Sequence, residues 1–205
     1  MALDKNVPIE LDIHILKDGN LVVYHDDSLK RLMNINRNID SYIYDELKQL
    51  TFPNTNTHIP LFKEVLDLVN KKEMIVIEIK RTNIMSYQEY CRKIVSILEK
   101  YSGDFVIKSF DVRIVHWFLH HTNYITGLLI ANRKNSYYDF LMQRRILIAC
   151  LKPNFISVND SIVSSKMVQN FRKKNPVLVW TIRNMETLNK VSSKADSYLI
   201  EKFYF

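Results

Sequence analysis

Two carboxylates stand two residues apart in the segment Pro-Ile-Glu-Leu-Asp-Ile, whose residue types are typical of a strand. Because side chains alternate between the two faces of a strand, Glu10 and Asp12 share one face while the apolar residues pack on the other. Burying neighbouring negative charges costs free energy unless a cation or a shared proton compensates. The pair therefore indicates either a cation-holding site or an edge strand with one solvated face.

A second apolar segment, at residues 74–80, ends in charged residues, with Glu78 and Lys80 on one face. In α/β barrels and open parallel sheets, functional side chains gather at the carboxyl ends of the strands. We therefore expect Glu78 and Lys80 to lie near Glu10 and Asp12. Three carboxylates without a cysteine or histidine cluster favour Mg²⁺ or Ca²⁺ over zinc. A lysine beside them suits an anionic ligand.

His25 follows the apolar run at 21–24 and precedes Asp26 and Asp27. An imidazole beside carboxylates can donate or accept a proton near neutral pH. Taken alone, this position also fits a surface histidine at the start of a loop. His14 shares the face of Glu10 and Asp12 but lies further along the strand, so we do not expect it to act as a second catalytic histidine.

The elements that position these residues alternate between β-type and helical patterns, which predicts an α/β fold with a parallel sheet. The expected strands are at 8–13, 74–80, 105–110, 125–130, 154–158, 176–182 and 197–200. The expected helices are at 61–70, 86–101, 112–121, 137–150, 164–174 and 186–193, the second beginning with a capping box at Ser86 and Glu89. A turn at 17–20 predicts a hairpin between the runs at 11–15 and 21–24.

The chain is expected to form a single domain over residues 1–205, with a polar, Asn-rich insertion at 26–60 that holds one short helix near 45–50. With only three glycines it cannot build a glycine-rich phosphate loop, which excludes Walker-type and dinucleotide-binding folds. Its net charge of +7 is dispersed, so we expect no nucleic-acid partner. No apolar run reaches ~18 residues, and the start lacks a signal-peptide pattern, so we expect a cytoplasmic chain without a transmembrane segment.

Two other groups of reactive residues are expected to be structural. Cys91 and Cys150 are predicted to be buried fillers, because neither has a partner at metal-ligand spacing. His116 and His120 are four apart in an apolar helix, but no glutamate lies between them as in a zinc helix. We expect surface or helix-end roles for them and for His121.

The carboxylates, His25 and Lys80 occur within a longer series of motifs that closely resembles the glycerophosphodiester phosphodiesterase family. The series consists of Glu-Leu-Asp-Ile-His at 10–14, Lys-Asp-Gly at 17–19, Val-Val-Tyr-His-Asp at 22–26, Ile-Pro-Leu at 59–61, Ile-Glu-Ile-Lys at 77–80, Ser-Phe-Asp at 109–111 and Val-Trp-Thr at 179–181. These motifs span most of the chain in the family's order. The paired Glu-x-Asp and His-Asp motifs are the most specific of them.

The resemblance implies a TIM-type barrel that uses a divalent metal to hydrolyse glycerophosphodiesters to glycerol 3-phosphate and an alcohol. Carried over to this chain, it makes Glu10, Asp12 and Glu78 metal ligands and His25 one of two acid–base histidines. It also makes Lys80 a catalytic contact to the phosphate and places Trp180 in the wall of the substrate pocket. The small-molecule phosphodiester is the expected partner.

The sequence departs from the family at its start, where members carry a His-Arg-Gly strand with the other catalytic histidine. We therefore expect about seven barrel strands, the first strand and helix being missing, and an activity impaired by that loss. The alternative is an inactive member that acts as a metal- or phosphate-binding module. An open barrel would expose the strand at 8–13 and the strand at 197–200 as edges, which predicts self-association.

Overall fold

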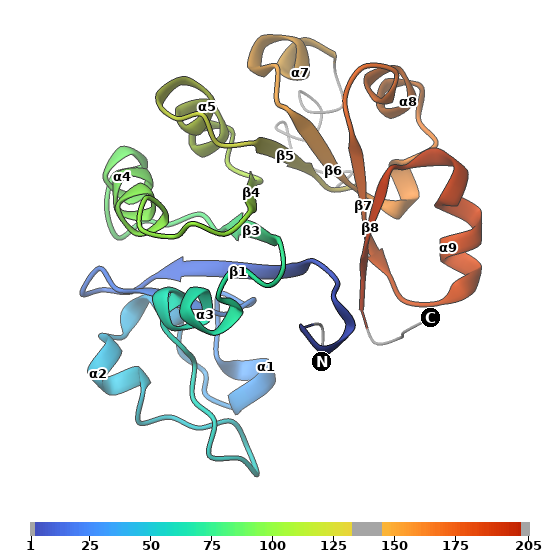
Figure 1. Ribbon diagram of the computed structural model, residues 1–205. Coiled ribbons are helices and arrows are strands. Elements are labelled where there is room, and N and C mark those ends of the chain that lie inside the picture. Colours follow the sequence, from blue (N-terminus) through green and yellow to red (C-terminus); the bar gives the residue numbers. More distant parts are fainter. Residues whose placement is uncertain (1–2, 133–144, 202–205) are drawn as a thin grey trace. The chain divides into compact units, whose positions relative to one another are not determined.

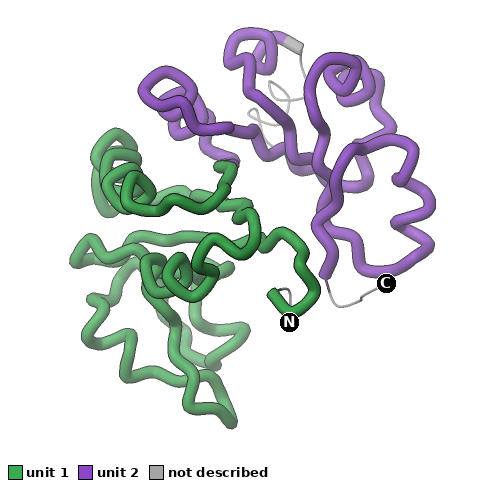
Figure 2. Tube along the Cα trace, in the orientation of Figure 1, with its two compact units in different colours: residues 1–107 green, residues 108–205 purple. Residues whose placement is uncertain are grey.

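The structure is a computed structural model that describes residues 3–132 and 145–201. It divides into two compact units, residues 1–107 and residues 108–205 (Figure 2). The strand order along the sheet is β2-β1-β3-β4-β5-β6-β7-β8, and the boundary between the units falls within β4 (Phe105–Ser109).

The first unit is built around β1 (Ile9–Ile15), which follows a short 3₁₀ turn, η1 (Leu3–Lys5). On one side β1 pairs antiparallel with β2 (Leu21–Val23), and on the other it pairs parallel with β3 (Ile75–Ile79). The predicted hairpin is therefore confirmed. Its turn contains Gly19 at φ +83°, a left-handed conformation that glycine adopts without a steric penalty.

Between β2 and β3 the chain forms short helices over a compact apolar cluster. In order these are α1 (Lys30–Met33), η2 (Ile39–Ser41), α2 (Tyr44–Leu47) and the longer α3 (Phe62–Val69). The cluster consists of Leu16, Val22, Tyr24, Leu29, Met33, Ile39, Tyr42, Leu47 and Ile59. The helix expected near 45–50 is thus a single turn that begins one residue earlier.

Helix α4 (Tyr87–Leu98) packs its apolar face on the first unit and begins at the predicted capping box, which is confirmed: Ser86 Oγ accepts from the Glu89 backbone. Tyr90 is fully buried, and its hydroxyl donates to the carbonyl of Ile13 at 3.2 Å. The same carbonyl accepts the Lys80 backbone N–H at 3.1 Å. A hydrogen bond therefore joins α4 to β1, the strand that carries Glu10 and Asp12.

The second unit alternates parallel strands with helices (Figure 1). After β4 come α5 (Val112–His121), β5 (Thr126–Ile130), α7 (Arg145–Leu151), β6 (Phe155–Asn159), η3 (Asp160–Ile162), α8 (Lys166–Arg172), β7 (Val177–Ile182), α9 (Met185–Val191), η4 (Ser192–Lys194) and β8 (Ser197–Ile200). Strands β5 to β8 pair in parallel. A hydrophobic core made mostly of Val, Ile and Leu side chains lies between these strands and their helices. All seven strands predicted from the sequence are present, with small shifts at their ends.

The structure bears on the expected burial of the cysteines, the helix expected at 137–150 and the expected edges of the sheet. Cys91 is buried as predicted, but Cys150 is exposed, because α7 turns Ile148 and Leu151 toward the core and Cys150 away from it. Part of the helix expected at 137–150, residues 137–144, lies outside the described residues. The third concerns the open edges of the sheet. Residues 13–15 of β1 are covered by β2, so the terminal strands of the sheet are β2 and β8.

Within the described ranges, none of the helices combines the length and apolar character needed to cross a bilayer. His116 and His120 are exposed on α5 with their rings stacked at 4.1 Å, and the rings of His120 and His121 each bond a carbonyl one turn back. This matches the surface and helix-end roles expected of them.

Candidate active site

The parallel pairing of β1 with β3 brings three carboxylates together at one place. Asp12 stands opposite Glu78 in the register, and Glu10 shares the face of Asp12. One carboxylate oxygen from each of the three residues lies within 4.8 Å of the others. Asp12 and Glu78 are 7% and 6% exposed, and Glu10 is half-buried. The sequence expectation that these side chains converge is met by this geometry.

Lys80 reaches into the same cluster from the end of β3. Its Nζ donates to Glu78 Oε1 at 2.6 Å and lies 2.7 Å from Asp12 Oδ1. Burial by itself would lower the pKa of Lys80, but the carboxylates of Glu78 and Asp12 raise it above its ordinary value. The amine is therefore a cation at neutral pH, placed where it can hold an anion.

Three carboxylates crowd together at this site. Burial and, next to it, the negative charge of Glu10 raise the pKa of Asp12 to about 6, although Lys80 acts in the opposite direction. Such a cluster of hard oxygen donors has the composition that Mg²⁺ and Ca²⁺ prefer. The donor set and the electrostatics of the site thus fit a divalent metal.

His25 lies at the end of the strand next to the carboxylates. It follows β2 by two residues, and the preceding residue, Tyr24, donates its backbone N–H to the carbonyl of Asp12 at 3.0 Å. The His25 side chain is 67% exposed, so its ring can be reached by a ligand. Its Nδ1 lies 2.6 Å from Oδ1 of Asp26.

Two residues around His25 were not identified from the sequence as site residues. Arg31 on α1 donates from Nε and Nη2 to the Asp26 carboxylate, at 2.6 and 2.9 Å. These bonds, with a smaller contribution from His25, hold the pKa of Asp26 at about 2. The adjacency of Asp26 to His25 was visible in the sequence, whereas the contact with Arg31 depends on how the chain turns after β2.

His14 is buried on the same face of β1 as Asp12. Its ring hydrogen-bonds with the backbone of His25, and its Nε2 is buried without a partner in the part of the chain that the structure describes. Burial lowers the pKa of His14, so the ring is neutral at physiological pH. The His14 ring therefore contacts the backbone of His25 and is buried away from solvent.

Trp180, the predicted pocket residue, belongs to the second unit. It lies near the carboxyl end of β7 and meets the ring of Phe110, which directly follows β4. Its Nε1 is buried with no hydrogen-bond partner among residues 3–132 and 145–201, whereas the Phe110 side chain is 39% exposed. The two rings form an aromatic surface at the carboxyl ends of these strands.

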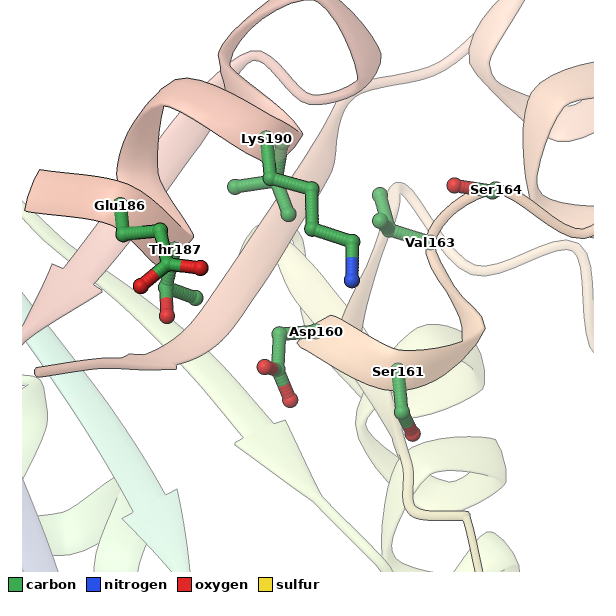
Figure 3. A pocket seen from close by; sticks show the side chains of 8 residues that line it. Asp160, Ser161, Val163, Ser164, Glu186, Thr187 and Lys190 are labelled. Atoms are coloured by element: carbon green, nitrogen blue, oxygen red, sulfur yellow. The ribbon is translucent and has the colours of Figure 1, made fainter. Parts of the chain in front are cut away.

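A cavity of about 260 Å³ opens in the second unit between η3 and α9 (Figure 3). Both elements follow the carboxyl ends of strands, β6 and β7, and Lys190 extends into the opening. Its lining is mixed in charge and consists of Asp160, Ser161, Val163, Ser164, Glu186, Thr187, Lys190 and Val191. Sequence reasoning gave no indication of this cavity.

Comparison with known proteins places this geometry in context. The model of the glycerophosphoryl diester phosphodiesterase family matches residues 7–202. A glycerophosphodiester phosphodiesterase of Bacillus altitudinis is 38% identical over 81 residues, covering 37% of this chain and 33% of the relative. One from Caldanaerobacter subterraneus subsp. tengcongensis is 31% identical over 112 residues, covering 50% of this chain and 46% of the relative. The chain thus aligns with less than half the length of these two relatives.

Solved structures show the same fold over nearly the whole chain. The Thermotoga maritima glycerophosphodiester phosphodiesterase superposes with a TM-score of 0.73 at 27% identity, covering 93% of this chain and 80% of that one. A phosphodiesterase of Oleispira antarctica, solved with sn-glycerol-3-phosphate, gives a TM-score of 0.78 at 18% identity and covers 93% and 79%. The expected TIM-type α/β fold is confirmed at this level.

Proposed function

Because the chain belongs to the glycerophosphoryl diester phosphodiesterase family, we propose that it hydrolyses glycerophosphodiesters to glycerol 3-phosphate and an alcohol with the help of a divalent metal. One observation carries the proposal: the buried cluster of Glu10, Asp12 and Glu78 with Lys80 in contact. This arrangement pairs a cation-binding group with an anion-binding group, as the reaction requires.

The three carboxylates would hold the metal, and a bound divalent cation supplies charge neutralisation of the phosphate and a lower pKa for the attacking hydroxyl. Lys80 would bind a phosphate oxygen and stabilise the extra negative charge that develops on it during the displacement. Its two carboxylate contacts keep the amine charged and fixed in place. The lysine thus meets the phosphate without having to reorganise.

His25 would exchange a proton with the alcohol oxygen or the attacking hydroxyl. Its ring is exposed, and its Nδ1 is already engaged by Asp26, which leaves Nε2 for this exchange. Trp180, with Phe110, would cover an apolar part of the substrate. These roles rest on the positions of the side chains and on the family's motifs.

The test is an assay of the 205-residue chain with glycerophosphocholine, with and without Mg²⁺ or Ca²⁺ and after chelation. We expect release of glycerol 3-phosphate and choline that depends on the metal. The matched control is a Glu10→Gln, Glu78→Gln double variant, which retains the shape of the side chains but removes two charges. Binding of metal and phosphate without hydrolysis would identify the chain instead as a binding module.

We also propose that copies of the chain associate through β8, a terminal strand of the sheet. Unpaired backbone groups at such edges can pair with a second chain. Sedimentation velocity over a range of concentrations tests this, and a monomer at every concentration would contradict it. Replacing Tyr198 of β8 with proline should weaken any association, because proline cannot donate a backbone hydrogen bond.

A further inference from the structure

The carboxylate of Asp26 connects His25 to Arg31. Its Oδ2 accepts a hydrogen bond from Arg31 Nε at 2.6 Å, and its Oδ1 accepts one from Nη2 at 2.9 Å. The same Oδ1 lies 2.6 Å from His25 Nδ1. A two-point contact with a planar guanidinium fixes the plane of a carboxylate as well as its position. The orientation of the Asp26 carboxylate is therefore set before it meets the imidazole.

The backbone around this group is also held at several points. Leu29 and Met33, which flank Arg31, are buried in the apolar cluster of the first unit. The carbonyl of Asp27 accepts the Ile39 N–H at 2.9 Å. On the other side of His25, the Tyr24 N–H is bonded to Asp12, and the His14 ring donates to the backbone carbonyl of His25. The exposed His25 ring thus projects from a restrained segment.

The charges select which ring nitrogen carries the proton. Arg31 keeps the pKa of Asp26 at about 2, so this carboxylate is ionised at every pH at which a histidine titrates. An ionised carboxylate accepts hydrogen bonds and cannot donate one. The short contact therefore requires a proton on His25 Nδ1, in neutral as well as in protonated imidazole. A neutral histidine free in water prefers the opposite tautomer, with its proton on Nε2.

We propose that Asp26 and Arg31 are positioning residues that hold His25 in the Nδ1–H tautomer and turn its Nε2 toward the substrate. The arrangement itself stands on the contacts above, and its use in catalysis rests on the proposed hydrolysis. Arg31 acts through Asp26, and Asp26 acts through His25. Neither residue is expected to touch the substrate.

The tautomer of His25 can be measured without turnover, by nitrogen-15 NMR of the imidazole groups in the full 205-residue chain. The His25→Gln variant assigns the His25 signals among those of the six histidines. We expect the neutral wild-type ring to be Nδ1–H, and the Asp26→Asn ring to shift toward Nε2–H. The matched control is Asp27→Asn, which removes the same charge one residue further on and should leave the tautomer unchanged.

Kinetics then tests whether the tautomer matters to the reaction. In Asp26→Asn, kcat should fall by about 10- to 100-fold, part of the ~10²–10⁴ that acid–base catalysis contributes, with little change in KM. Arg31→Gln should cause a smaller fall in kcat and a partial shift of the tautomer, because the carboxylate loses its two-point contact. This second variant also keeps the proposal testable if Asp26→Asn does not fold.

Two results would overturn the inference: a wild-type His25 in the Nε2–H form, or an Nδ1–H form that persists in folded Asp26→Asn and Arg31→Gln. Failure of the proposed function has a different signature. If the wild-type chain does not hydrolyse the diester but His25 responds to Asp26→Asn as expected, the positioning contact stands and the hydrolysis proposal fails.

Discussion

The aromatic rings of Phe110 and Trp180 meet edge to face, with centroids 5.8 Å apart and planes at 88°. Phe110 directly follows β4 and Trp180 lies near the carboxyl end of β7, and these two strands are three strand spacings apart in the strand order. In a flat sheet that separation is about 14 Å, because neighbouring strands lie about 4.8 Å apart. The contact therefore requires the strands of the second unit to curve, so that the carboxyl ends of non-adjacent strands converge.

This convergence leads to a prediction for Trp180. In Trp180→Ala the KM for glycerophosphocholine should rise by about tenfold, since an edge-to-face pair and the apolar cover of the substrate are lost. Trp180→Phe, which preserves an aromatic face, should recover most of the affinity. The control is Trp117→Phe, at the chain's other tryptophan, which lies on α5. A KM that is unchanged in Trp180→Ala would remove this residue from the proposed substrate surface.

The metal site is tested by Glu78→Gln. Loss of this carboxylate removes one of three ligands and a charge, so the affinity for Mg²⁺ or Ca²⁺ should fall by more than the ~10–100-fold that loss of an outer hydrogen-bond partner costs. Isothermal titration calorimetry measures the affinity directly. The control is Glu99→Gln, at an exposed residue that directly follows α4. Equal affinities in both variants would refute the assignment of Glu78 as a ligand.

Lys80 is predicted to act on the phosphate and not on the metal. In Lys80→Met, kcat for diester hydrolysis should fall by ~10²–10³, the usual cost of removing one group that stabilises developing negative charge. Metal should still bind, because all three carboxylates remain. Lys72→Met, an exposed lysine of the same unit, is the comparison. Complete loss of metal binding in a folded Lys80→Met protein would show that the lysine instead organises the cluster.

The low pKa of Asp26 predicts a pH-dependent contribution to stability. The folded-state pKa of about 2 lies below the ordinary 3.8, so the folded chain binds fewer protons at this group than the unfolded chain. The stabilisation is thus full above about pH 5 and is lost as pH falls toward 2. It amounts to about 2 kcal/mol, from the shift and 1.36 kcal/mol per pH unit.

Urea unfolding of wild type and Asp26→Asn at pH 7 and at pH 3 measures this contribution. The difference in unfolding free energy between the two proteins should be near the full value at pH 7 and smaller at pH 3. A difference that does not depend on pH would mean that Asp26 stabilises the chain through packing alone. Asp27→Asn, measured alongside, reports what removal of a neighbouring charge does by itself.

Tyr90 links helix packing to the site. In Tyr90→Phe, the free energy of unfolding should fall by about 1 kcal/mol, because the buried hydroxyl no longer donates to Ile13. The Ile13 carbonyl retains the Lys80 N–H, so the strand pairing should persist. Metal affinity should therefore change little. A large loss of metal affinity would show that the hydroxyl also fixes the carboxylate positions on β1.

Local residue patterns were enough to predict which residues share a face and in what order the elements occur. Two-residue spacing places Glu10 with Asp12 and Glu78 with Lys80 on any strand, whatever surrounds it. Turn chemistry at Lys17-Asp18-Gly19-Asn20 predicted the hairpin, and the alternating patterns predicted the seven other strands. These features are local, since they depend on residues close together in the chain.

Which of these residues meet depends on how the elements pack in the folded chain. The register of β1 against β3 sets Asp12 opposite Glu78, and the path of the chain after β2 brings Arg31 to Asp26. The exposure of Cys150 likewise depends on which face α7 turns toward its strands. Contacts of this kind depend on the packing of elements that are distant in sequence, and no local spacing specifies that packing.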